Sequence, residues 1–183
     1  MNIGVFVGSF NPPHKGHIGI VNYLINKKIL DKIIIIPTGN YWDKQDLINI
    51  DDRINMLKFY ENDKIIIDNK HNNMEYTYLI MNSLKEEYPH DKLSLIIGAD
   101  NIINFNKWKN YQELIKYHLI IMQRDNIDIE KYIKEYKITN YTIIDDYPYI
   151  DISSTIIRKK LDNKYLDKEI IDYIKSRGLY ENK

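Results

Sequence analysis

Residues 8–17 have the sequence Gly8-Ser9-Phe10-Asn11-Pro12-Pro13-His14-Lys15-Gly16-His17. Just before them, residues 3–7 form a short apolar, β-branched run of the kind that is typical of a buried strand. After them, apolar residues recur at helical spacing, at Ile18, Val21, Leu24 and Ile25. Residues 8–17 are therefore predicted to turn the chain from a strand into a helix.

A turn of this kind is suited to binding phosphate. The first amides of a helix lack intrahelical partners and carry a partial positive charge, which attracts phosphate oxygens. His14 and His17 are three residues apart, so they lie on one face if the helix has begun by His14. Solvated surface histidines or half of a zinc site would show the same spacing. The absence of cysteine, with only His71, His90 and His118 elsewhere, disfavours the metal.

A second polar cluster lies near the other end, at Asp151-Ile152-Ser153-Ser154-Thr155-Ile156-Ile157-Arg158. Serine and threonine cap helices well, so this stretch predicts another helix start. Arg158 lies four residues after Ser154 and therefore on the same helix face. A guanidinium beside hydroxyls and backbone amides would bind polyphosphate, whereas a plain cap with an unrelated surface arginine is the simpler alternative.

Together, H-x-G-H at residues 14–17 and I-S-S-T-x-I-R at residues 152–158 resemble the signature of the nucleotidylyltransferase superfamily. The resemblance implies that the chain binds a nucleoside triphosphate and transfers its nucleoside monophosphate part to an acceptor phosphate. It implies catalytic roles for His14 and His17 at the α- and β-phosphates, and for Arg158 at the β- and γ-phosphates.

The middle of the sequence narrows the resemblance to the bacterial nicotinate-nucleotide adenylyltransferase family. The residues that carry it are Ile36-Pro37-Thr38-Gly39-Asn40, Glu75-Tyr76-Thr77, Tyr88-Pro89, Leu95-Ile96-Ile97-Gly98-Ala99-Asp100-Asn101, Phe105 and Trp108. That family joins the AMP part of ATP to nicotinate mononucleotide in NAD biosynthesis, with Mg²⁺ held mainly by the ATP phosphates. The ATP-binding residues implied are Gly8, Ser9, Phe10, Gly98, Asp100, Arg124, Ser153, Ser154 and Thr155. The acceptor-binding residues implied are Asn40, Lys44, Tyr76, Thr77, Trp108 and Lys109, and no residue is implied as a metal ligand.

Three departures from the family pattern concern mainly the acceptor side. Asn40 is followed by Tyr41-Trp42-Asp43-Lys44 where the family usually has Pro-Pro-His-Lys. Thr77 is followed by Tyr78-Leu79-Ile80, which loses the acidic and second hydroxyl positions of the family's T-x-D-T. Arg124 is followed by Asp125 in place of proline. The acceptor therefore stays open between nicotinate mononucleotide, its nicotinamide counterpart, phosphopantetheine and another small phosphate.

Strand-like and helix-like segments alternate along the chain, which predicts an α/β fold with a parallel sheet. We expect strands near 2–7, 32–36, 64–68, 93–97, 117–122 and 141–144. We expect helices near 16–28, 51–60, 74–87, 110–116, 128–136, 153–161 and 167–176. The expected architecture is a single doubly wound (Rossmann-like) domain over residues 1–183, with helices on both faces of the sheet and the phosphate motif at the switch point. Residues 39–49 are predicted to form an active-site loop, although a plain surface loop has the same composition.

The composition predicts a cytoplasmic enzyme. Lys+Arg and Asp+Glu both number 26, so no basic excess points to nucleic acid. The start lacks the features of a signal peptide, and the apolar run at residues 33–36 is too short to span a membrane. The expected partners are ATP and nicotinate mononucleotide, without nucleic acid or membrane, and homo-oligomer formation stays open.

Rival classes remain at this point. One is a sibling enzyme, such as pantetheine-phosphate adenylyltransferase or a cytidylyltransferase, against which the Gly98-Ala99-Asp100-Asn101 and Trp108 block argues. Another is a non-catalytic nucleotide-binding protein, against which the presence of both motif histidines and Arg158 argues. A class I aminoacyl-tRNA synthetase fragment would carry a lysine-rich loop where this chain has its second motif.

Overall fold

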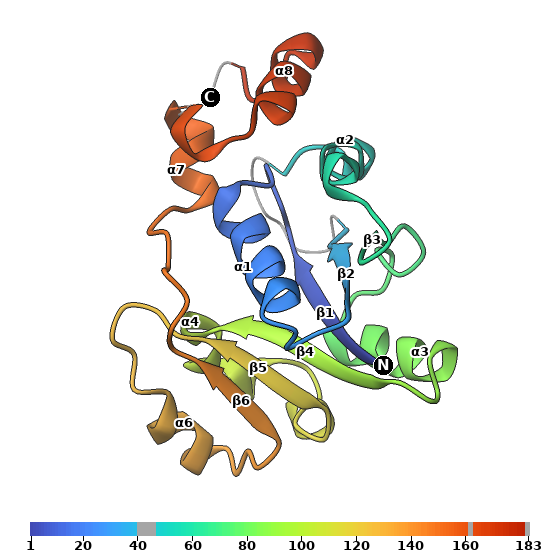
Figure 1. The fold of residues 1–183 in the computed structure, drawn as a ribbon, viewed down its shortest axis with the longest axis vertical. Coiled ribbons are helices and arrows are strands. Elements are labelled where there is room, and N and C mark those ends of the chain that lie inside the picture. The colour runs from blue at the N-terminus through green and yellow to red at the C-terminus, as the bar shows by residue number, and fades with distance from the viewer. Residues whose placement is uncertain (40–46, 161–162, 182–183) are drawn as a thin grey trace.

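The computed structural model describes residues 1–39, 47–160 and 163–181 of the chain. Its centre is a six-stranded parallel sheet in the order β3-β2-β1-β4-β5-β6 (Figure 1). The strands are β1 (Asn2–Gly8), β2 (Lys32–Pro37), β3 (Ile65–Ile67), β4 (Lys92–Gly98), β5 (His118–Met122) and β6 (Tyr141–Ile144). The strand order reverses between β1 and β4, so the carboxyl ends of these two strands flank the crevice where doubly wound folds bind ligands.

Helices follow the strands and cover both faces of the sheet. They are α1 (Lys15–Asn26), α2 (Ile50–Leu57), α3 (Thr77–Glu87), α4 (Ala99–Ile102), α5 (Tyr111–Leu114), α6 (Ile129–Glu135), α7 (Ser154–Lys160) and α8 (Lys168–Arg177). Short 3-10 turns are η1 (Lys58–Tyr60), η2 (Phe105–Lys107) and η3 (Asn163–Tyr165). Val21 of α1 and Leu57 of α2 belong to the core on one face, while Leu84 of α3 and Ile133 of α6 belong to the core on the other.

The isoleucine run of β2 shows why the sheet is covered on both sides. Ile33 and Ile35 contribute to the core beneath α1, and Ile34 and Ile36 contribute to the opposite core. All four side chains are at most 2% exposed. Successive side chains of a strand point to opposite faces, so an unbroken apolar run requires apolar partners on both.

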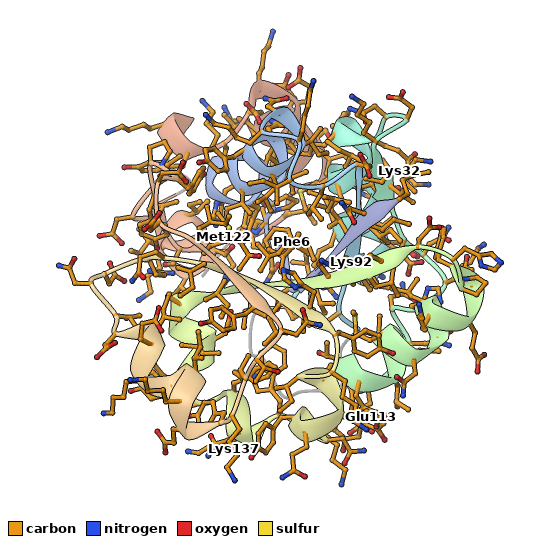
Figure 2. The ribbon with its side chains drawn as sticks, turned by 60° about the horizontal axis from the view of Figure 1, so that its bottom comes forward. Phe6, Lys32, Lys92, Glu113, Met122 and Lys137 are labelled. Carbon is orange, nitrogen blue, oxygen red and sulfur yellow. The ribbon has the colours of Figure 1, made fainter. Side chains whose placement is uncertain are left out.

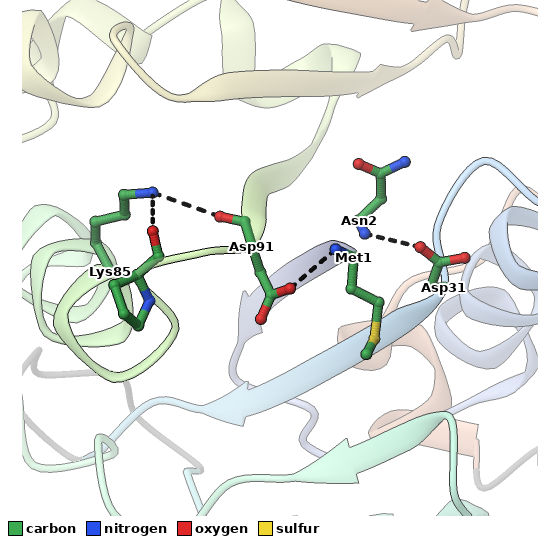
Figure 3. Close-up of polar contacts among 6 residues, drawn as sticks. Met1, Asn2, Asp31, Lys85 and Asp91 are labelled. Atoms are coloured by element: carbon green, nitrogen blue, oxygen red, sulfur yellow. Dashed lines mark hydrogen bonds and ion pairs between the residues drawn. The ribbon is translucent and has the colours of Figure 1, made fainter.

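Polar contacts fix the amino end of β1 to the segments that precede both neighbouring strands (Figure 3). The amino group of Met1 lies 2.9 Å from an Asp91 carboxylate oxygen, just before β4. The Asn2 amide donates to the Asp31 carboxylate at 2.8 Å, just before β2. These contacts agree with the parallel register in which Ile3 pairs with Lys32 and Leu93.

A third apolar cluster joins the C-terminal helices to α2. Met56 of α2 packs with Ile157 of α7 and with Ile170 and Ile174 of α8. Figure 1 shows α7 and α8 beyond the end of the sheet, beside the start of α1. Figure 2 shows Phe6 of β1 near the middle of the view, and its ring centroid lies 5.3 Å from that of Phe10 in the turn that leads to α1. The C-terminal helices therefore lie at the same end of the sheet as the turn after β1, whereas Met1 lies at the opposite end of that strand.

The predicted fold class and all six strands are confirmed, with strand boundaries displaced by at most two residues. The helix expected at 51–60 ends at Leu57 and continues as η1, and the helix expected from residue 74 begins at Thr77. After β4 the chain continues into α4, for which no helix was expected, and the Asn101 side chain accepts from the Gly98 amide at 3.1 Å at its start. Among the described residues, no helix is long and apolar enough to cross a membrane.

Candidate active site

The two motif histidines form the cap of α1. His14 is the N-cap, and its Nδ1 accepts from the Gly16 amide at 3.0 Å. In return, Nδ1 of His17 accepts from the His14 amide at 3.1 Å. The rings stack with their centroids 3.6 Å apart. The helix begins only at Lys15, so the condition attached to the one-face prediction is not met, and the two rings come together through stacking at the N-cap instead.

These hydrogen bonds assign the tautomer of both rings. Because each Nδ1 accepts from a backbone N–H, a neutral imidazole must carry its proton on Nε2. Burial lowers the pKa of His14 to about 4. Burial, together with the proximity of His14, holds the pKa of His17 well below 6.5. At neutral pH the pair therefore offers two uncharged Nε2–H donors.

The small residues and the aromatic ring of the turn shape this pair. A Cβ at Gly16 would lie 2.8 Å from the His14 ring, so the stacked arrangement requires glycine there. Phe10 has a positive φ of 48° and is buried, with its ring edge-on to His17 at 4.9 Å and to Phe6 at 5.3 Å. The apolar Phe10 ring thus packs against the His17 ring and supports it.

The second motif lies against the first, as the family resemblance implied. The Ser154 hydroxyl donates to the Pro12 carbonyl at 3.2 Å. Nη1 of Arg158 donates to the Asn11 carbonyl at 2.7 Å, and Nη2 lies 3.4 Å from Oγ1 of Thr155. The Ser153 hydroxyl accepts from the Ile156 amide, which caps α7. Residues more than 140 positions apart in sequence therefore bracket the turn between β1 and α1.

The residues implied for adenosine also come together. Nη1 of Arg124 lies 3.6 Å from the Asp100 carboxylate, and its Nε lies 3.0 Å from Asp125. The guanidinium covers the Tyr149 ring at 4.4 Å. Gly98 precedes Asp100 at the end of β4, next to β1. A planar cation with one aromatic face beneath it is thereby fixed beside the switch point.

A pocket of about 500 Å³ opens next to this crevice. Four of its lining residues were implied for the acceptor, namely Tyr76, Thr77, Trp108 and Lys109. The rest of the lining comes from Val7, Thr38, Met74, Glu75, Ile80, Lys107 and Leu114. The Thr38 amide donates to the Gly8 carbonyl at 2.8 Å, so the pocket adjoins the glycine turn.

Two acceptor residues implied by the sequence, Asn40 and Lys44, lie outside the described residues. The departure at Leu79 lies on the outside of α3, where the side chain is 38% exposed and does not contribute to the pocket lining. The acidic position lost at Leu79 therefore lies outside the described pocket lining, whereas Ile80, at the lost hydroxyl position, belongs to it.

Sequence reasoning missed two residues that hold the site together. Arg53 donates to the Ser9 and Thr38 carbonyls, at 2.9 and 2.7 Å. The Tyr180 hydroxyl donates to the Asn11 side chain at 2.6 Å. The one signal in the sequence is Arg53 itself, a cation at helical spacing among the apolar residues of α2.

Metal ligands were not expected from the protein. In the described part of the chain, no group of three or more His, Cys, Asp or Glu side chains could hold a metal ion. Nucleotidyltransferases generally use a divalent metal together with the nucleoside triphosphate.

Comparisons with known proteins extend over the same residues. A family model described as Cytidylyltransferase-like matches residues 5–160. A probable nicotinate-nucleotide adenylyltransferase of Clostridium tetani is 34% identical, over 96% of this chain and 97% of the relative. The nicotinate-nucleotide adenylyltransferase of Bacillus subtilis is 30% identical, over 98% of both chains.

Solved structures similar to this chain include proteins of the same description. Plasmodium falciparum nicotinic acid mononucleotide adenylyltransferase, solved in complex with NaAD, superposes with a TM-score of 0.82 at 26% identity and covers 100% of this chain and 98% of its own. The same protein in complex with APC gives a TM-score of 0.82 at 25% identity, with the same coverage. With its phosphate turn, second motif and adjoining pocket in place, the chain belongs to the nicotinate-nucleotide adenylyltransferase family of the cytidylyltransferase-like proteins.

Proposed function

We propose that this chain joins the AMP part of ATP to nicotinate mononucleotide, giving nicotinate adenine dinucleotide and pyrophosphate in NAD biosynthesis. The observation that carries the proposal is the contact between two sites. A turn with two Nε2–H donors and Arg158 adjoins, through the Thr38 to Gly8 hydrogen bond, a pocket lined by Tyr76 and Trp108. The NaAD named for the Plasmodium structure combines both halves of such a product.

On the ATP side, the triphosphate would lie along the turn between β1 and α1. His14 and His17 donate to the α- and β-phosphates through Nε2, and the amides of residues 8–10 form the backbone cradle. Arg158, with the hydroxyls of residues 153–155, holds the outer phosphates. Gly98, Asp100 and Arg124 lie along adenosine.

The reaction requires positioning and stabilisation of charge. A phosphate oxygen of the acceptor attacks the α-phosphorus of ATP, a new phosphorus–oxygen bond forms, and the bond to the bridging oxygen of the β-phosphate breaks. Pyrophosphate leaves with that electron pair. No side-chain nucleophile is needed, and donors aimed at the phosphate oxygens are the main source of rate. The uncharged histidines suit this role because they donate without needing to change protonation.

On the acceptor side, the pocket offers an aromatic ring, two lysines and a helix start. Trp108 supplies a surface for the pyridine ring, held from below by Phe105 at 5.0 Å. Helix α3 begins at Thr77 without a side-chain hydrogen bond as its cap, so its first amides suit a carboxylate. Lys107 and Lys109 add positive charge to the lining.

Mg²⁺ would be held mainly by the ATP phosphates, because it keeps several waters and needs few protein ligands. When bound, it neutralises charge on the triphosphate as pyrophosphate departs. This chain contributes the orientation of the phosphates through His14, His17 and Arg158.

An acceptor panel tests the proposal. Purified protein with ATP and Mg²⁺ would be given nicotinate mononucleotide, nicotinamide mononucleotide, phosphopantetheine and no acceptor, and pyrophosphate release would be measured. We expect release with the first and identification of nicotinate adenine dinucleotide by mass spectrometry. Release only with another phosphate would assign a sibling transferase, and binding of ATP without release in any arm would indicate a non-catalytic protein.

A further inference from the structure

Arg53 is the largest side chain of the described structure to be fully buried, with 0% exposure. It lies in α2 beside Ile54 and Leu57, which pack into the core beneath the sheet. Burial lowers its pKa to about 10, so the guanidinium is still charged at neutral pH. A charged group in a core is retained at a cost in desolvation unless hydrogen bonds compensate it.

The guanidinium donates hydrogen bonds to backbone carbonyls of three different segments. Nη1 donates to the Ser9 carbonyl at 2.9 Å and to the Thr38 carbonyl at 2.7 Å. Nε donates to the Ile48 carbonyl at 3.1 Å, just ahead of α2. Ser9 belongs to the proposed ATP cradle, and Thr38 lines the proposed acceptor pocket. Nη1 of Arg53 therefore binds a carbonyl from each of the two proposed substrate subsites.

Because the peptide unit is planar, a hydrogen bond to a carbonyl also fixes the direction of the next residue's amide, on the other side of the loop. In a planar trans peptide, the carbonyl of one residue and the N–H of the next point in opposite directions. With the Ser9 carbonyl held on Nη1, the Phe10 amide must point away from Arg53. With the Thr38 carbonyl held on the same atom, the Gly39 amide must also point away. The orientations of these two amides are thereby tied to each other.

We propose that Arg53 is a positioning residue that sets the ATP cradle and the acceptor pocket in register, so that the attacking phosphate faces the α-phosphorus. This rests on the proposed adenylyl transfer. Arg53 touches neither substrate and acts through the loops after β1 and β2. Misplacement of reacting groups by about 1 Å costs on the order of a hundredfold in rate, so a loose register would be visible in turnover.

The test is Arg53→Lys, which keeps the charge and removes the planar fork. A single ammonium group cannot hold three carbonyls in the geometry of a guanidinium. We expect kcat to fall about 10- to 100-fold, with the specificity constants for both ATP and nicotinate mononucleotide reduced. The assay would be run well below the melting midpoint of each variant, and turnover would be normalised to folded protein.

Arg177→Met is the matched control. Arg177 of α8 pairs at 3.2 Å with Asp52, the neighbour of Arg53 in α2, but Arg177 is exposed and contacts neither loop. Its turnover should stay within twofold of the unsubstituted protein. If Arg53→Lys also keeps its turnover and only melts earlier, or if its defect is confined to one substrate, the positioning role is wrong. Absence of turnover in the unsubstituted protein would instead refute the proposed function.

If the lysine variant fails to fold, two further measurements still test the positioning role. Arg53→Gln removes the buried charge, keeps an N–H₂ donor, and should show the same loss for both substrates. In the unsubstituted protein, ATP alone should slow amide hydrogen exchange at Phe10 and at Gly39 together. Slowing at Phe10 without any change at Gly39 would overturn the coupling.

Discussion

At the scale of single residues, the site depends on two imidazoles that are held neutral. His14 and His17 each use Nδ1 as an acceptor for a backbone amide, so each neutral ring carries its proton on Nε2. The same bonds cap α1, so the pair that starts the helix is also the pair proposed to donate to phosphate. The sequence positions of these histidines therefore do not distinguish a role in starting the helix from a role in function.

His17→Ala should lower turnover by on the order of a hundredfold or more, because it removes one donor aimed at developing charge. The loss of the reciprocal cap should cost about 1 kcal/mol of stability, which leaves the fold intact. The measurements are steady-state kinetics and thermal unfolding. His90→Ala, at an exposed position, is the control and should be indistinguishable from the unsubstituted protein. Near-normal turnover of a folded His17→Ala protein would remove His17 from the site.

The lowered pKa of His14 predicts a pH dependence of stability. An unfolded histidine titrates near 6.5, whereas buried His14 titrates at about 4. Between these values the unfolded chain binds more protons, so the free energy of unfolding falls as pH falls, and above 6.5 the contribution is fully present. At pH 5.0 the loss due to His14 should be about 2 kcal/mol.

His14→Asn isolates that contribution, because asparagine retains the capping acceptor but does not titrate. Urea unfolding at pH 7.5 and pH 5.0 would be compared for the two proteins. The unsubstituted protein should lose more stability on acidification than His14→Asn does. Equal losses would mean that His14 is not buried as a neutral ring.

At the scale of elements, α1 is packed against the segment that follows β6. A Cβ at Gly19 would overlap the Tyr147 hydroxyl, while its distance to the adjacent ring carbon would be an ordinary 3.5 Å. The Tyr147 ring also lies edge-on to Tyr23 of α1, at 5.2 Å. Glycine inside a helix is normally unfavourable, so its presence here is explained by the close approach of Tyr147.

Gly19→Ala should therefore destabilise the protein by about 1–3 kcal/mol in the native background, because of overpacking. In a Tyr147→Phe background the hydroxyl is gone, and the same change should be neutral or stabilising by about 0.5–1 kcal/mol, as expected for alanine in a helix. Chemical denaturation of the four proteins measures the coupling. Additive effects, within about 0.5 kcal/mol, would show that Tyr147 moves aside freely.

The elements also show how far sequence patterns reach. Runs rich in apolar and β-branched residues located all six strands, because strands of a sheet covered on both faces bury most of their side chains. Helix α4 was not predicted from the sequence, because its start depends on a side-chain cap by Asn101. The pocket joins Tyr76 and Trp108, which no spacing relates, so only the family resemblance placed them together. Arg53 could not be assigned from the sequence, because its carbonyl partners lie in three separate segments.

At the scale of the whole molecule, the phosphate turn is assembled from both ends of the chain. Tyr180, after α8, donates to the Asn11 side chain, and Arg158 of α7 donates to the Asn11 carbonyl. The apolar cluster around Met56 and Ile170 fixes these C-terminal helices to α2. Since α2 also carries Arg53, the C-terminal helices and the proposed ATP side of the site are connected through α2.

The acceptor side leads to a prediction about specificity: nicotinate mononucleotide should be used with a higher specificity constant than nicotinamide mononucleotide. The two differ only in a carboxylate against a neutral amide. The start of α3 and the side chains of Lys107 and Lys109 favour the anion, whereas Glu75 in the same lining opposes it. The carboxylate also accepts from backbone amides, while a carboxamide would present its own N–H₂ to some of them.

Mispaired buried polar groups cost about 1–3 kcal/mol, which corresponds to roughly a tenfold to hundredfold preference for the acid. Steady-state assays with each mononucleotide at fixed ATP and Mg²⁺ give the ratio of specificity constants. Lys109→Met should narrow the ratio, because the ammonium group, 6.0 Å from the centre of the Tyr76 ring, lies beside the start of α3. His90→Ala should leave the ratio unchanged. Equal use of both mononucleotides, or a preference for the amide, would mean that this pocket reads its acceptor by shape and ring stacking on Trp108 rather than by charge.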